Sequence, residues 1–172
     1  MAKFLITGDP GSGKSALAEA LARRGYTAYD TDDLPDVTRL EDTAGRPVDW
    51  PEPPVDWSRY GWNWQEAGLR ERLASAGTVF VAAIVSNQEE YYSWFDAIFV
   101  LVADVATLRQ RLLSRNGYGK HPAELAGILD GHAERVAEML SVPQAVAIDA
   151  DRPLERVADD VIAYTQAREA TA

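Results

Sequence analysis

At 172 residues, with 47% hydrophobic and 26% charged residues, the chain has the size and composition of one compact globular domain, predicted to span residues 1–172. The formal net charge of −10 argues against a nucleic-acid partner held by a broad basic face, and the lack of cysteine excludes disulfides and thiolate metal sites. No apolar run approaches the ~20 residues of a membrane span, and the N-terminus lacks a signal-peptide pattern, so a cytoplasmic protein without a membrane partner is expected.

The first predicted element is a short buried strand over residues 3–7, followed at once by a glycine-rich segment and a helix over 15–24. The segment matches Gly-x-x-x-x-Gly-Lys-Ser/Thr at every fixed position. Its glycines let the backbone approach phosphates closely, and successive N–H groups with the helix N-terminus attract their charge. Lys14 is expected to reach the β- and γ-phosphates and Ser15 to ligate Mg²⁺. The segment therefore predicts binding of a nucleoside triphosphate by Gly8, Asp9, Pro10, Gly11, Ser12, Gly13, Lys14 and Ser15.

A second short strand over residues 26–29 ends in three aspartates, at positions 30, 32 and 33. In an open parallel sheet, ligands gather at the carboxyl ends of the strands, so these aspartates are expected to face the same crevice as the phosphate-binding segment. The alternative is a group of N-caps for the next helix. Three carboxylates beside phosphates would repel them unless Mg²⁺ or a substrate hydroxyl lay between.

Residues 35–64 interrupt this regular alternation. Five prolines prevent a long helix, while the aromatic content argues against disorder, so we predict a small ordered insertion with a helix beginning near Asp56 or Ser58. Two interpretations of its aromatic rings stay open. The rings either fill a hydrophobic gap or form a substrate wall, in which they stack on a base or sugar and Arg59 binds a polar or anionic group. The tryptophans concerned are Trp50, Trp57, Trp62 and Trp64.

The next elements are a helix that ends at Ala76 and an uninterrupted apolar run over 78–85, typical of a central strand buried on both faces. This run ends in Ser86, Asn87 and Gln88, again on the crevice side. A further buried strand covers residues 96–102, and Asp104 is expected to cap the helix that follows.

That helix carries Arg109, Arg111 and Arg115 and leads into a glycine-containing loop, so residues 115–122 are predicted to form a lid. The alternative for these arginines is a solvated helix face. A helix from Pro122 to Leu140, a fifth strand over 145–148 and a last helix beginning near Pro153 complete the chain. His132 is assigned no role. The order of the elements predicts an α/β domain with five parallel strands.

The phosphate-binding segment, the Asp-Thr-Asp at 30–32 and the arginine-rich helix before a lid resemble the small-molecule P-loop kinases. Shikimate and gluconate kinases are the most similar, with nucleoside and nucleotide kinases beside them. The resemblance covers most of the chain in layout, and the phosphate-binding segment is its specific part. It implies a P-loop NTPase three-layer sandwich, with a five-stranded parallel sheet in the order 2-3-1-4-5 and helices on both faces.

The resemblance also implies roles for residues outside the phosphate-binding segment. It places Asp30 near Mg²⁺ and Asp32 on the accepting hydroxyl, with Arg115 as the lid arginine and Arg111 as the second candidate. Adenine would lie against Arg152 and Pro153. The shikimate kinases' glycine triplet after the third strand is absent, as is an acidic residue of the Walker B kind. Shikimate is therefore not the expected substrate, and Mg²⁺ is left to Ser15, phosphates and water-mediated contacts with Asp30.

Together these observations predict an ATP- and Mg²⁺-dependent kinase that phosphorylates a small-molecule hydroxyl. Lys14 and Arg115 would stabilise charge on the transferring group, and Asp32 would orient the hydroxyl and take its proton. The tryptophans favour a nucleoside as the acceptor, with a sugar or sugar acid next. The substrate contacts are expected from Asp32, Asp33, Arg59, Trp62, Ser86, Asn87 and Gln88.

Two other classes of protein remain open. The segment from Gly25 to Pro35 is faintly similar to the start of the RapZ-type RNA-binding adaptor proteins, so the alternative is a nucleotide-binding regulator without kinase activity. An ATPase motor is disfavoured by the small size and by the lack of an acid after the third strand. We expect a small-molecule acceptor as the partner, no nucleic acid, and a monomer or homodimer.

Overall fold

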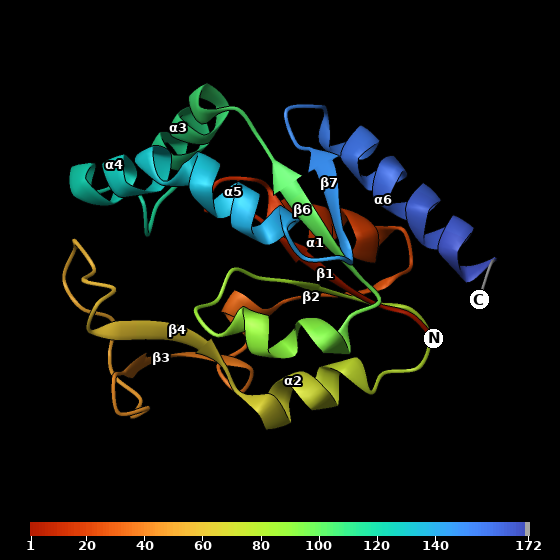
Figure 1. Ribbon diagram of the computed structural model, residues 1–172, viewed down its shortest axis with the longest axis horizontal. Coiled ribbons are helices and arrows are strands. Elements are labelled where there is room, and N and C mark those ends of the chain that lie inside the picture. Colours follow the sequence, from red (N-terminus) through yellow and green to blue (C-terminus); the bar gives the residue numbers. More distant parts are fainter. Residues whose placement is uncertain (171–172) are drawn as a thin grey trace.

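The computed structural model describes residues 1–170 (Figure 1). The strands are β1 (Lys3–Thr7), β2 (Thr27–Asp30), β3 (Thr38–Asp42), β4 (Tyr60–Trp64), β5 (Val79–Ala82), β6 (Ala97–Val102) and β7 (Ala145–Asp149). The α-helices are α1 (Lys14–Arg23), α2 (Glu66–Leu73), α3 (Val105–Ser114), α4 (Pro122–Asp130), α5 (His132–Leu140) and α6 (Leu154–Glu169). Two 3-10 helices, η1 (Thr31–Asp33) and η2 (Gln88–Trp94), follow β2 and β5.

Five parallel strands form the central sheet in the order β2-β5-β1-β6-β7. When the strands of this sheet alone are numbered along the chain, the order is 2-3-1-4-5, which confirms the predicted topology. β1 lies in the centre, paired through Phe4 with Phe80 on one side and with Ala97 on the other. The carboxyl end of β1, from which the phosphate-binding segment emerges, is therefore flanked by the ends of β5 and β6.

Helices cover the sheet on both faces because alternate residues of each buried strand point to opposite sides. Phe4 and Ile6 pack with residues of α1, α3, α4 and α6 in one core cluster. Leu5 packs on the opposite face with residues of α2, η2 and α5. The three layers of the predicted sandwich follow from this alternation.

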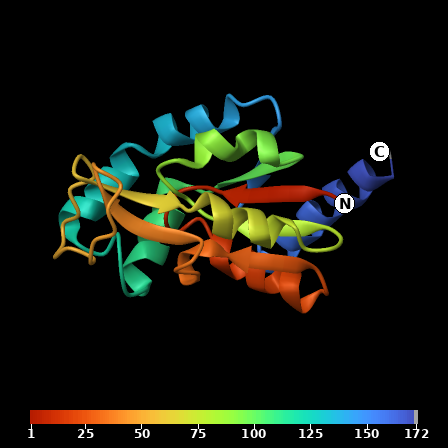
Figure 2. The ribbon, with the colours of Figure 1, turned by 90° about the horizontal axis from the view of Figure 1, so that it is seen from below.

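The inserted segment is an antiparallel hairpin, in which β3 pairs with β4 from Thr38 opposite Trp64 to Asp42 opposite Tyr60. The helix expected near Asp56 or Ser58 is not formed. Instead, the Asp56 carboxylate accepts hydrogen bonds from the backbone N–H and the hydroxyl of Ser58, at 3.1 and 2.6 Å, and the chain turns into β4. Such a side-chain bond competes with helix formation and favours a turn. The hairpin, α3 and α4 lie at one end of the molecule, opposite both chain termini (Figures 1 and 2).

Three other expectations about the elements are corrected. The helix expected to end at Ala76 ends at Leu73, and the strand expected over 78–85 keeps its pairing only from Val79 to Ala82. The single helix expected over 122–140 is broken at Gly131 into α4 and α5. A Cβ atom at this glycine would lie 2.2 Å from Nη1 of Arg135, so a side chain there would displace this guanidinium group.

Asp104 occupies the N-cap position of α3, but its side chain makes no capping hydrogen bond. Its backbone N–H donates to the Asp151 carboxylate at 2.9 Å, which ties the start of α3 to the loop after β7. Within residues 1–170, no helix is long and apolar enough to cross a membrane.

Candidate active site

The phosphate-binding segment takes a tight course between β1 and α1. Gly8 has a φ of 144°, and a Cβ atom there would lie 2.7 Å from the Leu101 carbonyl oxygen of β6. A side chain at this position is therefore excluded by backbone conformation and by space. The Ser12 N–H donates to the Asp9 carbonyl at 3.0 Å, and the Leu17 N–H to the Gly13 carbonyl at 2.9 Å. The segment forms a closed turn that continues directly into the N-terminus of α1.

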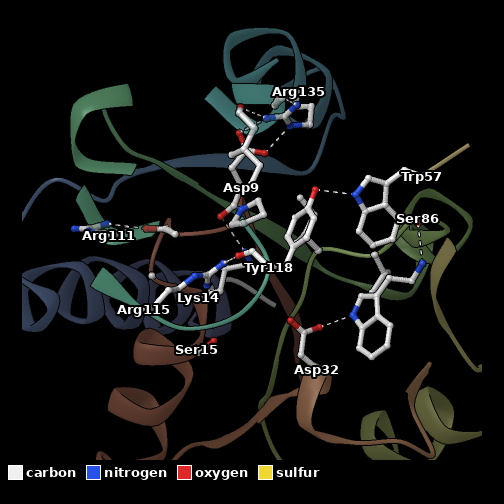
Figure 3. Close-up of a pocket in the computed structure, with 18 of the residues that line it drawn as sticks. Asp9, Lys14, Ser15, Asp32, Trp57, Ser86, Arg111, Arg115, Tyr118 and Arg135 are labelled. Carbon is white, nitrogen blue, oxygen red and sulfur yellow. Dashed lines mark hydrogen bonds and ion pairs between the residues drawn. The ribbon is translucent and has the colours of Figure 1, made fainter. Parts of the chain in front are cut away.

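Lys14 lies at the centre of this turn. Its Nζ donates to the carbonyl oxygen of Gly8 at 2.7 Å and to that of Asp9 at 3.0 Å. Figure 3 shows Lys14 and Asp9 beside each other. Burial of the ammonium group lowers the pKa of Lys14 from 10.5 to about 8, and the negative charge of Asp32 partly opposes this effect. The protein therefore buries this cation without placing enough negative charge beside it to compensate. A triphosphate would supply the missing negative charge.

Two hydroxyl groups of the segment also fit a magnesium-bound triphosphate. The Ser12 Oγ is buried and has no hydrogen-bond partner within the described chain, which is unusual for a buried polar atom. Ser15, at the N-terminus of α1, lines a cavity of about 740 Å³ that also borders Asp9, Pro10, Gly11, Gly13 and Lys14. Among residues 1–170 there is no cluster of three or more His, Asp or Glu side chains that would bind a metal by itself. The donor set therefore fits Mg²⁺ held together with phosphates rather than alone.

Asp9 is turned away from the position where phosphates would lie. Its side chain is wholly buried (0% exposed), and both carboxylate oxygens are bound by α5. Arg135 donates from Nε to Oδ1 at 2.7 Å and from Nη2 to Oδ2 at 3.0 Å, while Nδ1 of His132 lies 2.6 Å from Oδ2. The other ring nitrogen of His132 lies 2.9 Å from the Ala103 carbonyl oxygen. Asp9 thus contributes its backbone to the phosphate loop, while its side chain joins that loop to α5.

Asp30, at the end of β2, and Asp32 and Asp33, in η1, occupy different environments. Asp32 lines the cavity, and its Oδ1 accepts a hydrogen bond from Trp62 Nε1 at 2.8 Å (Figure 3). Although its side chain is still exposed to solvent, desolvation by the cavity walls raises its pKa, and the Trp62 hydrogen bond opposes the rise. Asp30 does not line the cavity; its Oδ1 accepts the Asp32 N–H at 3.1 Å and caps η1. Asp33 is exposed and lies outside the cavity lining as well.

The sequence left open whether the four tryptophans fill the core or line the substrate cavity, and the structure shows both positions. Trp64 is 2% exposed and fills the core beside Tyr91 and Phe95, with its Nε1 donating to Thr31 Oγ1 at 2.9 Å. The other three line the cavity as one continuous wall. The ring of Trp50 stands edge-on to Trp57 at 6.1 Å and to Trp62 at 5.5 Å between centroids. We name Trp50, Trp57 and Trp62 the aromatic wall.

The aromatic wall is attached to the lid loop. Trp57 Nε1 donates to the Tyr118 hydroxyl at 2.7 Å, and the two rings meet edge to face at 5.4 Å between centroids. Glu124, buried in α4, accepts the Val55 N–H at 3.0 Å and the Gly119 N–H at 2.9 Å. One carboxylate thus joins the inserted segment to the lid loop, and residues far apart in the sequence enclose the same cavity.

Two arginines of α3 and its C-cap point to different parts of the site. Arg111 donates to the carbonyls of Gly11 at 3.5 Å, Ser12 at 3.3 Å and Ala150 at 2.9 Å, between the phosphate loop and the loop after β7. Arg115 lines the cavity, and its Nη2 donates to the Tyr118 carbonyl at 3.1 Å. Burial lowers the pKa of Arg115, while the negative charge of Asp32 raises it.

A second cavity, of about 220 Å³, also borders the phosphate loop and shares Gly13, Ala16 and Arg111 with the lining of the main cavity. Arg111 and Arg152 both border it, together with Ser12, Gly13 and Leu154. Pro153 does not; it occupies the N-cap position of α6, and Arg152 forms an ion pair with Asp160. Of the two residues against which the family resemblance places adenine, Arg152 borders this cavity and Pro153 does not.

Four expected substrate contacts, namely Asp33, Arg59, Asn87 and Gln88, lie outside the main cavity, and two of them hold the scaffold. Asn87 binds the backbone of Trp64 through Oδ1 at 2.9 Å and Nδ2 at 3.1 Å, which pins the end of β4. Gln88 is buried and bonds to Thr7 and Tyr92. Arg59 is exposed, with its guanidinium over the ring of Tyr60. Ser86 does line the cavity, and its Oγ accepts the Trp62 N–H at 3.1 Å.

Several residues that line the cavity or hold its walls had no role assigned from the sequence. His132 and Arg135 lie three positions apart on one face of α5, a spacing that also occurs on ordinary solvated helices. Tyr118 and Glu124 lie in and after the lid, where nothing in the pattern indicates a partner in residues 50–57. Trp50 and Trp57 belong to the tryptophan group considered above, but no spacing rule distinguishes them from the buried Trp64.

We expect Arg115→Ala to lower kcat by roughly 100-fold, because a preorganised cation beside Asp32 and Lys14 would be lost. KM for ATP is expected to change less, since Lys14 and Arg111 remain. Steady-state kinetics with a working acceptor measures both values. Arg109→Ala is the matched control, because Arg109 is an exposed residue of the same helix outside the cavity lining. Equal kcat for the two variants would mean that Arg115 only belongs to a solvent-exposed helix face and has no role in phosphoryl transfer.

We expect Arg135→Gln to weaken ATP binding roughly 10-fold by exposing phosphates to the unneutralised charge of Asp9. The double variant Asp9→Asn/Arg135→Gln removes that charge and is expected to recover most of the affinity. Titration calorimetry of the two variants and of Asp9→Asn measures this coupling. If the double variant bound ATP as weakly as Arg135→Gln, Arg135 would contact the nucleotide directly.

The phosphate loop opens into a cavity that is bordered by Arg115 and by the aromatic wall, as in a P-loop nucleotide-binding protein. The family model described as an AAA domain matches residues 5–138, and the chain belongs to this family of P-loop NTPases. The fold is similar to that of a gluconokinase from Sinorhizobium meliloti 1021, with a TM-score of 0.57, 23% identity, and 94% of this chain and 90% of that chain covered. No curated protein matches the sequence. The predicted fold, that of the P-loop small-molecule kinases, is confirmed.

Proposed function

We propose that this protein is an ATP-dependent phosphotransferase that moves the γ-phosphoryl group to a hydroxyl of a small molecule. One observation carries the proposal: Lys14, Ser15, Arg115 and Asp32 border a single cavity of about 740 Å³. The first three are groups that bind or neutralise a triphosphate, and the fourth is a carboxylate able to take a proton. A plain nucleotide hydrolase would not need an aromatic wall opposite its phosphate loop.

The roles follow from the position of each group. Lys14 and Arg115 stabilise negative charge on the transferring phosphoryl group, and Ser15 holds Mg²⁺, which neutralises the phosphates when bound. Asp32 orients the acceptor hydroxyl and takes its proton as the hydroxyl oxygen bonds to the γ-phosphorus and the bond to the β,γ-bridging oxygen breaks. Trp62 fixes Oδ1 of Asp32, so Oδ2 is the oxygen available to the acceptor. Asp30, as the cap of η1, holds the turn that presents Asp32.

An ATP-depletion screen against nucleosides, nucleotides, sugars and sugar acids tests this function. We expect at least one class to stimulate ATP consumption by wild-type protein and not by Asp32→Asn. A nucleotide-binding regulator would bind ATP without any such stimulation. That result, with ATP binding verified by calorimetry, would reject the kinase and favour the regulator.

A further inference from the structure

The cations around the main cavity differ in how far the protein already neutralises them. The charge of Arg135 is compensated by Asp9, which binds its Nε and Nη2, and the carbonyls of Ile128 and Gly127 accept two further N–H groups. Lys14, Arg111 and Arg115 bind only neutral backbone carbonyls, so their charges are not compensated by a carboxylate contact. All three border the phosphate loop side of the cavity, where a triphosphate that carries several negative charges needs them. Among the lining residues of the described chain, no further cation is left for a charged acceptor.

The acceptor side of the cavity is aromatic and apolar. The aromatic wall, Ile84, Val85 and Tyr118 border it, and Asp32 is the carboxylate that faces it. The indole N–H groups of Trp57 and Trp62 are already bound, by Tyr118 at 2.7 Å and by Asp32 at 2.8 Å. These two rings therefore present faces and edges to an acceptor, not hydrogen-bond donors. Few polar side-chain groups keep any bonding capacity there, namely Asp32 Oδ2, the indole N–H of Trp50 and the hydroxyl hydrogens of Ser86 and Tyr118.

We propose that the acceptor is an uncharged compound with a flat aromatic ring, of nucleoside chemistry, whose ring is held by the aromatic wall. This inference rests on the proposed kinase function and narrows it. A sugar acid or a nucleotide brings a negative charge close to Asp32, where no unoccupied cation compensates it, and is therefore disfavoured. A neutral polyol would bury several hydroxyls against apolar rings, leaving them without partners. An aromatic ring stacks on indole faces without that cost, and a single hydroxyl reaches Asp32.

The first experiment compares acceptors that differ in one property. Ribonucleosides, their 3′-monophosphates, ribose and gluconate are tested at equal concentration for stimulation of ATP consumption. The 3′-monophosphate keeps the ring and the 5′-hydroxyl but adds charge, while ribose keeps the neutral hydroxyls but lacks the ring. We expect a nucleoside to have a kcat/KM at least 10-fold above its 3′-monophosphate and at least 100-fold above ribose and gluconate.

The second experiment measures the ring site without turnover. Quenching of tryptophan fluorescence is followed as the same nucleoside is added to wild type, Trp50→Leu and Trp94→Leu. Trp50 is 50% exposed, so its replacement leaves the core intact, and Trp94 on η2 is the matched control because it lies outside the cavity lining. We expect Trp50→Leu to weaken nucleoside binding at least 10-fold while the Kd for ATP is unchanged, and Trp94→Leu to alter neither.

The possible outcomes separate the two proposals. Efficient use of gluconate or of a nucleotide in preference to nucleosides would overturn the inference and leave the kinase function standing. Nucleoside binding that depends on Trp50, without any acceptor-stimulated ATP consumption, would overturn the kinase function and support an aromatic-ring site. If no nucleoside is bound and no compound is phosphorylated, both are wrong.

Discussion

Asp32→Asn is expected to reduce kcat by roughly 10²- to 10⁴-fold with little change in KM for ATP or for the acceptor. Asparagine keeps the shape of the side chain and its hydrogen bond from Trp62 but cannot take a proton. In the wild type, desolvation raises the pKa of Asp32, and the base is active only when ionised. Activity should therefore fall, as the pH is lowered, at a higher pH than an ordinary aspartate would give. The pH profile of kcat, measured for wild type and variant, tests this. The decrease of kcat at low pH should be absent from the residual activity of the variant.

Asp30→Asn is the matched control for this prediction. An asparagine at position 30 retains the oxygen that accepts the Asp32 N–H, so η1 should keep its conformation and kcat should change less than tenfold. A raised Mg²⁺ requirement in Asp30→Asn would instead place this carboxylate in the metal shell implied by the family resemblance. Full activity of Asp32→Asn would remove the proposed base and with it the mechanism.

Lys14→Met is expected to abolish measurable turnover, with a loss on the order of 10²- to 10³-fold or more, and at the same time to stabilise the ligand-free protein. The pKa of Lys14 falls from 10.5 to about 8 on folding because the ammonium group is desolvated. This change corresponds to about 3 kcal/mol by which the charged form opposes folding at pH 7, an upper value for the gain from replacement. Methionine fills the same volume without charge. Differential scanning calorimetry and an ATPase assay measure the two effects.

The pH dependence of this stability gain is a further part of the same test. A lysine whose pKa is lowered on folding opposes folding fully below pH 8, and its effect disappears as the pH rises from about 8 to 10.5. The advantage of Lys14→Met should therefore be present at pH 7 and small at pH 10.5. Lys120→Met, at an exposed lysine of the lid loop, serves as the control. A lower Tm for Lys14→Met at pH 7 would contradict the view that Lys14 is held without enough compensating charge.

The sequence alone determined the nucleotide-binding class and the order of the main elements. Both depend on local pattern: the glycine and lysine spacing of residues 8–15 occurs between a strand and a helix, and apolar runs identify the buried strands. The family resemblance then supplied the sheet order, which the structure shows. Neither the sequence pattern nor the resemblance indicated that, of the three aspartates Asp30, Asp32 and Asp33, only Asp32 lines the cavity. Each is an aspartate after the same strand, and only the geometry of η1 determines which one faces the cavity.

The tertiary structure alone decided what surrounds the phosphate loop. Asp9 fits the variable second position of the motif and was expected to contact the nucleotide, yet its side chain is bound by His132 and Arg135, more than 120 residues away. The break at Gly131, hidden within an apparently continuous helical pattern, positions α5 for this contact. Likewise, Trp57 and Trp64 are equivalent in the sequence, but one meets the lid loop at Tyr118 and the other fills the core. Such contacts join residues through the packing of separate elements, and neither periodicity nor motif spacing records which surfaces will meet.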